Sequence, residues 1–176
     1  MKIFRLGALV VLLLTLCAAV QAEQDRVPTR ITSEDMTYSG KAREVVFEKD
    51  VHAVRRDFEL WSDRLIVHLS EAPQGNGTGE GRLPGGEDAE VERIVALDNV
   101  RVKSGERRGN CTKLVYETAT EIITMTGDPV LIQKENTISG DKIVINVRED
   151  TSEVFSGGEK RVQAVFYSDP DEEVDR

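Results

Sequence analysis

The chain has 176 residues, which is long enough for one domain with a hydrophobic core of its own. Its 32 acidic residues outnumber its 23 basic residues, so the net charge is −9. This balance opposes binding to the phosphate backbone of nucleic acids, and nucleic acid is therefore excluded as an expected partner.

Residues 1–22 have the pattern of a secretory signal peptide. Lys2 and Arg5 give a positive start, residues 6–16 form an apolar run, and Val20-Gln21-Ala22 offers small residues at a cleavage site. An uncleaved membrane anchor is the alternative, but this apolar stretch is shorter than the ~20 residues that span a bilayer. We therefore expect cleavage after Ala22.

A short pattern recurs along the rest of the chain. Asp35-Met36-Thr37-Tyr38 returns 29 residues later as Arg64-Leu65-Ile66-Val67, and Lys113-Leu114-Val115-Tyr116 returns 29 residues later as Lys142-Ile143-Val144-Ile145. The middle copies are further apart because a glycine-rich stretch at 72–90 is inserted between them. A fixed period of this length is typical of stacked supersecondary units.

A second pattern lies between the copies of the first and predicts turns, so that each repeat holds two strand-like segments. Its copies are Glu48-Lys49-Asp50-Val51, Leu97-Asp98-Asn99-Val100 and Thr126-Gly127-Asp128-Pro129-Val130. Within the segments apolar residues alternate, as Val45 and Phe47 do around Val46. A period of two, rich in Val, Ile and Thr, indicates strands with one buried face. The sequence therefore predicts an all-β fold.

Cys111 is the only cysteine outside the predicted signal peptide, because Cys17 lies within it. A lone cysteine cannot form an intramolecular disulfide, so stability has to come from the sheet and its core. The alternating pattern around Cys111 predicts a strand and a buried, unreactive thiol.

No catalytic or metal-binding pattern stands out. The glycine-rich stretch lacks the Gly-Lys-Ser/Thr that completes a phosphate loop. Asp35, Asp63 and Asp141 are too widely spaced for a calcium repeat, and we interpret them as turn formers. His52 and His68 lie in separate strands with no third ligand or carboxylate partner at ligand spacing. We therefore predict that the protein is not an enzyme and uses no metal or cofactor.

Taken together, these motifs resemble the LptA, or OstA-like, family of periplasmic lipopolysaccharide-transport proteins. The resemblance runs from Val27 to Tyr167. The family favours Gly-Asn where this chain has Glu48-Lys49-Asp50, and the insertion at 72–90 is long and rich in glycine. The resemblance rests on Ile31-Thr32-Ser33-Glu34-Asp35, Val45-Val46-Phe47-Glu48-Lys49-Asp50-Val51, Ser62-Asp63-Arg64-Leu65, Met125-Thr126-Gly127-Asp128-Pro129-Val130, Ser139-Gly140-Asp141-Lys142-Ile143 and Phe155-Ser156-Gly157-Gly158-Glu159-Lys160-Arg161-Val162.

The resemblance implies a twisted, partly open β-jellyroll of stacked, V-shaped antiparallel strands over residues 23–168, interrupted by a flexible insertion at 72–90. Residues 169–176 would be a disordered acidic tail. The implied function is to bind the lipid A part of lipopolysaccharide in an apolar groove. The groove residues we expect are Ile31, Met36, Tyr38, Phe47, Leu60, Leu65, Val67, Val100, Leu114, Tyr116, Met125, Ile132, Ile143 and Ile145.

The implied partners lie at the two ends of the stack. An inner-membrane, LptC-like protein would add to the N-terminal edge near residues 28–32, and the next copy or an outer-membrane, LptD-like translocon to the C-terminal edge near residues 161–167. The lipopolysaccharide would thus pass from the inner-membrane export complex to the outer-membrane translocon. Two alternatives remain open: a membrane-anchored, LptC-like relative of the same pathway, and a structural β-filament without a lipid ligand.

Cleavage after Ala22 gives a mature protein that begins at Glu23 and is recovered in the soluble periplasmic fraction. Mass spectrometry of the purified protein checks this mass directly. Intact residues 1–22 on membrane-bound protein would instead favour the anchored relative.

Overall fold

The computed structural model describes residues 28–70, 90–158 and 161–167, and within them it is an all-β protein. The predicted signal peptide, most of the glycine-rich insertion and the acidic tail lie outside the described residues. The twelve strands of the single sheet are β1 (Arg30–Thr32), β2 (Asp35–Ser39), β3 (Glu44–Arg55), β4 (Phe58–Leu69), β5 (Val91–Ser104), β6 (Arg107–Glu117), β7 (Ile122–Thr126), β8 (Val130–Gln133), β9 (Asn136–Ser139), β10 (Lys142–Asn146), β11 (Thr151–Phe155) and β12 (Gln163–Val165).

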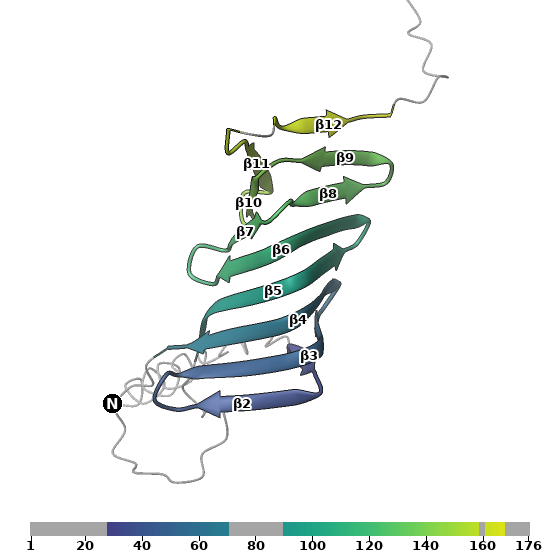
Figure 1. Cartoon of the computed structure of the whole chain (residues 1–176). Helices are drawn as coiled ribbons and strands as arrows, with labels where there is room; N and C mark the ends of the chain where they lie inside the picture. Colours follow the sequence, from purple (N-terminus) through teal and green to yellow (C-terminus); the bar gives the residue numbers. More distant parts are fainter. Residues whose placement is uncertain (1–27, 71–89, 159–160, 168–176) are drawn as a thin grey trace, which may run out of the picture.

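The antiparallel sheet is folded along its length into two arms, with long strands β3 to β6 running through both. The first arm begins with β2 on residues 44–48 of β3, and the second begins with β1 on residues 52–54 of that strand. Above β6 the first arm continues through β7, β10 and β11, and the second through β8, β9 and β12. Figure 1 shows these two short stacks side by side, the first on the left and the second on the right.

The four copies of the sequence repeat begin at equivalent positions in four strands of the first arm. Each copy of the pattern begins a segment that runs in the same direction, and an oppositely directed segment lies between neighbouring copies. The row, in order of pairing, is Asp35, Glu48, Arg64, Leu97, Lys113, Thr126 and Lys142. The insertion connects the end of β4 to the start of β5. These two ends are adjacent, because the Ser70 amide donates a hydrogen bond to the Glu90 carbonyl at 2.8 Å.

The long strands β3 and β5 bend where the second sequence pattern occurs. The backbone is left-handed at Lys49 and Asp50 (φ 64° and 47°), and the register of β3 against β4 shifts there. Asp98, Asn99, Gly127 and Asp128 are also left-handed. Asn, Asp and Gly accept this conformation at the lowest cost. Lys49 and Asp50 adopt it as well, so the bend in β3 forms without glycine or asparagine.

Polar contacts hold neighbouring bends together at this corner. The Asn99 side-chain amide donates to Asp63 at 2.6 Å, and Lys49 Nζ lies 2.6 Å from Asp35 Oδ2. The Asp35 carboxylate also raises the pKa of the Lys49 ammonium group. Asp141 accepts a hydrogen bond from the Gly157 amide. The three recurring aspartates therefore make contacts between neighbouring segments at the corner, and none of these contacts is to the local backbone of a turn.

Replacing Gly127 with Ala should destabilise the protein by about 2–4 kcal/mol, since φ is +77° and an added Cβ would lie 2.4 Å from Thr112 Cβ. Gly105→Ala is the matched control, because φ is +57° there and no atom lies within 4 Å of an added Cβ. The control should cost only about 1–2 kcal/mol. Urea unfolding measures both values, and equal losses would show that the corner contact is unimportant.

Candidate functional site

Two rows of apolar side chains line the inner face of the first arm, because alternate residues of each strand face the same way. The row nearer the corner consists of Met36, Phe47, Leu65, Ala96, Leu114, Met125, Ile143 and Val154. The row nearer the open side, or mouth, consists of Tyr38, Val45, Val67, Ile94, Tyr116, Ile123 and Ile145.

A matching row lines the second arm, and the two arms meet over it. Its members are Ile31, Ala53, Leu60, Val102, Gly109, Leu131, Ile138 and Ala164. An added Cβ on Gly109 would lie 3.0 Å from Met125 Cε of the first arm and 3.1 Å from Leu131 Cδ2 of the second. Glycine in a strand marks such a close approach. The two arms are thus in contact at Gly109, and we call this point of contact the waist.

The interior is closed at its centre and more open towards its borders. Leu65, Leu114, Met125 and Ile143 are 0–2% exposed. Ile94, Tyr116, Ile123 and Ile145, nearer the mouth, are only half-buried. At the N-terminal end Met36 and Tyr38 are 54% and 41% exposed. The two arms therefore enclose an apolar strip that runs the length of the stack. It is accessible at this end and along the mouth from Ile94 to Ile145, whereas Val45 and Val67 of the mouth row are buried.

The structure brings together all the predicted groove residues except one. Ile132 was expected to face inward, and this expectation is wrong. Ile132 pairs with Arg108 and Thr137, whereas its neighbour Leu131 pairs with Gly109 and packs against the core. Successive side chains of a strand point to opposite faces, so Ile132 lies on the outer face.

The prediction also missed inward residues that carry weak signals. Ala96 is fully buried and Val154 packs against the core. In the sequence, however, each stands next to a larger apolar residue that is the more obvious core candidate. Gly109 has no apolar side chain to detect. An isolated glycine within a strand pattern was the only signal for the close approach.

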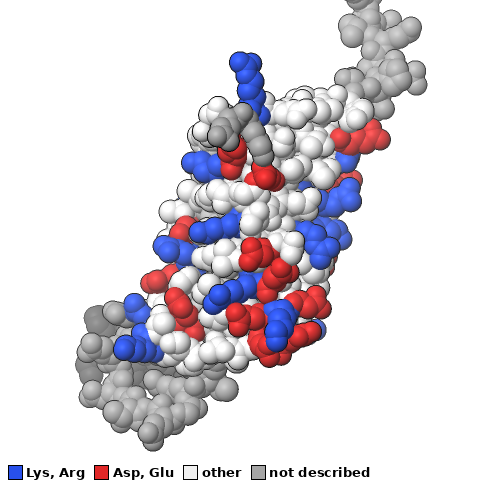
Figure 2. Space-filling model, viewed as in Figure 1, with Lys and Arg blue, Asp and Glu red and all other residues white. Residues whose placement is uncertain are grey.

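The outer face of the first arm carries a half-buried apolar row flanked by charged rows. Its apolar members are Val46, Ile66, Val95, Val115 and Val144. Ion pairs cross between neighbouring strands beside it, with His68 3.1 Å from Glu44 and Arg93 2.7 Å from Glu117. In Figure 2, basic and acidic side chains are interspersed over the face shown. Polar side chains thus separate this outer apolar row from the strip enclosed between the arms.

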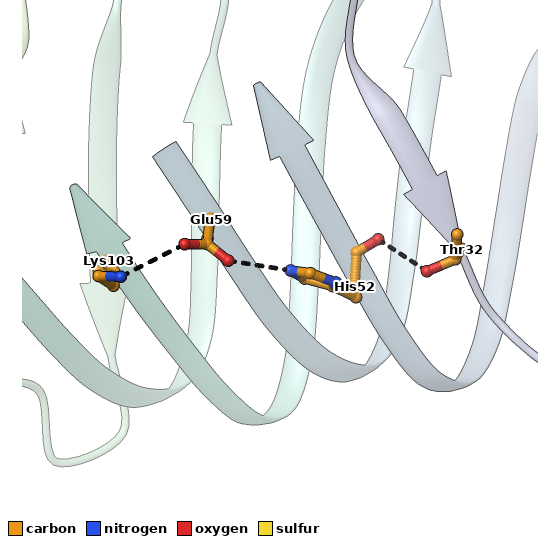
Figure 3. A network of polar contacts seen from close by, with 4 residues as sticks. All are labelled: Thr32, His52, Glu59 and Lys103. Carbon is orange, nitrogen blue, oxygen red and sulfur yellow. Dashed lines mark hydrogen bonds and ion pairs between the residues drawn. The ribbon is translucent and has the colours of Figure 1, made fainter. Parts of the chain in front are cut away.

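The outer face of the second arm carries a polar network (Figure 3). His52 Nε2 lies 3.3 Å from one oxygen of Glu59, and Lys103 Nζ lies 3.5 Å from the other. The His52 ring stacks on Trp61 with a centroid distance of 4.9 Å. His52 and His68 therefore each have a carboxylate partner on the neighbouring strand, a pairing that the spacing of residues in the sequence does not reveal.

These contacts are structural ion pairs between strands. The described part of the chain contains no group of three or more His, Cys, Asp or Glu side chains that could hold a metal ion. Nor does that part include a helix long and apolar enough to cross a membrane. Cys111 is buried as predicted, and burial raises the pKa of its thiol to about 11.

Fold and site together define an open β-jellyroll whose two arms enclose an apolar strip. Comparison with known families gives the same class, since residues 30–151 match the model described as "LptA/(LptD N-terminal domain) LPS transport protein". This chain belongs to that lipopolysaccharide-transport family.

Individual relatives agree. The chain is 26% identical over 148 residues to the lipopolysaccharide export system protein LptA of Escherichia coli K12, a match that covers 84% of this chain and 75% of the relative. The LptA of Shigella flexneri has the same identity and coverage. The fold resembles the crystal structure of LptH, the periplasmic LptA homologue of Pseudomonas aeruginosa, with a TM-score of 0.64 at 14% identity over 81% of this chain and 96% of that one.

The inward position of Leu131 can be tested against its neighbour. Leu131→Asn should destabilise the protein by about 2–3 kcal/mol, because it places an amide where Leu131 packs against the hydrophobic core. Ile132→Asn should cost about 1 kcal/mol or less. Chemical unfolding measures both, and a larger loss at Ile132 would reverse the assignment of faces.

Proposed function

We propose that the protein is a periplasmic carrier that binds the acyl chains of lipid A between its two arms. In this role it passes lipopolysaccharide from the inner-membrane export complex towards the outer-membrane translocon. The single observation that carries the proposal is the unbroken apolar strip from Met36 and Tyr38 at one end to Ile143 and Ile145 near the other.

The energetics of acyl chains explain why such a strip is useful. Exposing one 14-carbon chain to water costs on the order of 10 kcal/mol at ~0.8 kcal/mol per methylene. Lipid A carries several such chains. A continuous apolar path along the stack lowers this barrier without any covalent chemistry.

The proposal requires the arms to separate when lipid enters. The inner rows of the two arms pack against each other, so that Leu65, Met125 and Ile143 are buried. Acyl chains would replace these contacts between the arms with contacts of the same apolar kind. The half-buried mouth residues Tyr116 and Ile123 would meet the lipid first.

The ends of the stack suit the proposed partners. Within the described residues, β1 and β2 pair only with β3, and β11 pairs only with β10. Free strand edges accept another chain by β-augmentation. An LptC-like protein would add at β1 and β2, and an LptD-like protein or another copy at β11 and β12. Exposed apolar side chains flank both edges, with Met36 54% exposed at one and Phe166 68% exposed at the other.

A structural filament is the second candidate, and the closed centre of the interior favours it. A filament would use the same edges but never open its arms. The two candidates therefore differ in whether lipid reaches the inner rows. The third alternative, an anchored LptC-like relative, differs in the fate of residues 1–22.

Photo-crosslinking on the two faces separates carrier from filament. A photoreactive residue at Phe47 or Tyr116, which face inward, should capture lipopolysaccharide in cells. The matched controls are the adjacent outward positions Val46 and Val115, which are also apolar and half-buried. They should capture at least about tenfold less, because a shift of one residue moves the probe to the opposite face of the sheet.

Hydrophobicity alone cannot produce this contrast, since both members of each pair are apolar. Equal capture on both faces would contradict the carrier. No capture on either face by folded protein would favour the filament.

A further inference from the structure

One ion pair joins the tips of the two arms. Arg107 begins β6 at the tip of the second arm, next to the turn from β5. Asp150 is the residue before β11, in the turn at the tip of the first arm. Arg107 Nη1 lies 3.0 Å from Asp150 Oδ1. Because its two partners belong to opposite arms, this contact crosses the mouth of the apolar interior.

Alternation along β6 directs Arg107 towards the mouth. Arg107 lies two residues from Gly109 and therefore shares the inner face on which Gly109 meets Met125 and Leu131. The intervening Arg108 faces outward with Ile132. The Arg107 guanidinium thus lies where the apolar strip ends and solvent begins.

The pair can exchange partners at low cost. The Arg107 and Asp150 side chains are 57% and 78% exposed, and exposed ion pairs contribute only about 0–1 kcal/mol. A guanidinium binds phosphate through two parallel hydrogen bonds. A phosphate held at the mouth would therefore compete with the Asp150 carboxylate for Arg107.

Two other ion pairs at the arm tips each lie within one arm. Lys134 lies 4.0 Å from Glu106 at the tip of the second arm, and Arg148 lies 3.5 Å from Glu121 at the tip of the first. Neither pair crosses the mouth. Arg107 combines an inward position with a partner on the opposite arm, so a change of partner there bears directly on separation of the arms.

We propose that Arg107 recognises the phosphorylated headgroup of a lipid whose chains lie between the arms, in competition with the Asp150 carboxylate. This inference rests on the proposed function. A phosphate displaces the Asp150 carboxylate, which releases the contact across the mouth as the acyl chains enter behind it. An apolar molecule without an anionic group does not release this contact.

The test compares lipid A with the same lipid after enzymatic removal of its phosphates, using purified full-length mature protein. Arg107→Gln should weaken binding of intact lipid A about tenfold and leave binding of the dephosphorylated lipid unchanged or stronger. Asp150→Asn should strengthen binding of intact lipid A about threefold, because the competing carboxylate is lost. Equilibrium binding of a fluorescent derivative of each lipid gives these ratios.

Arg93→Gln is the matched control, since Arg93 is also half-exposed and paired with a glutamate but lies on the outer face. It should change neither affinity, and circular dichroism verifies that every variant is folded. Equal effects of Arg107→Gln on both lipids, or none on either, would overturn the headgroup role while leaving the groove intact. Failure of the wild-type protein to bind either lipid would overturn the proposed function and this inference with it.

Discussion

The bend in the long strands is the constraint on which the rest of the structure depends. A flat antiparallel sheet would expose both faces to water, and an apolar row on either face would have no partner. Bending the long strands, in β3 and β5 at left-handed pairs such as Asp98 and Asn99, turns the sheet back on itself. The apolar rows of the two arms then cover each other, and the contact between Met125 and Gly109 is the result.

The corner also sets which residues face inward. Across a left-handed bend, inward-facing side chains stay an even number of residues apart, so that Phe47 and Val51 both face the core. At corners without a left-handed pair, the alternation of inward and outward side chains shifts by one residue. Ser62 and Leu65, which are both buried, lie on either side of such a corner. Because the two types alternate along the chain, all the inner rows fall on one side. The same corners therefore determine the core, the candidate site and the inward position of Arg107.

Much of this was predictable from the sequence, because a repeated pattern reports a repeated backbone. The 29-residue spacing from Asp35 to Arg64 corresponds to one pair of strands, and the second pattern marks the bends. Ile132 was misplaced for a physical reason. Val130, Leu131 and Ile132 are consecutive apolar residues with no polar residue between them to mark the outer face. The phase there depends on the conformation of Gly127 and Asp128, which composition does not reveal.

The contacts between arms were beyond prediction, because they join residues far apart in the chain. Nothing in the sequence relates Arg107 to Asp150, which lie at the tips of strands on opposite arms. The closed waist was equally hidden, since it depends on the absence of a side chain at Gly109.

Solvent extraction of the folded protein, purified without detergent from cells that make lipopolysaccharide, tests the central claim most directly. Mass spectrometry of the extract would identify whatever lies between the arms. The account predicts lipid A-containing lipopolysaccharide in the extract. An extract free of lipid would contradict the account and leave a filament whose interior is filled by its own side chains.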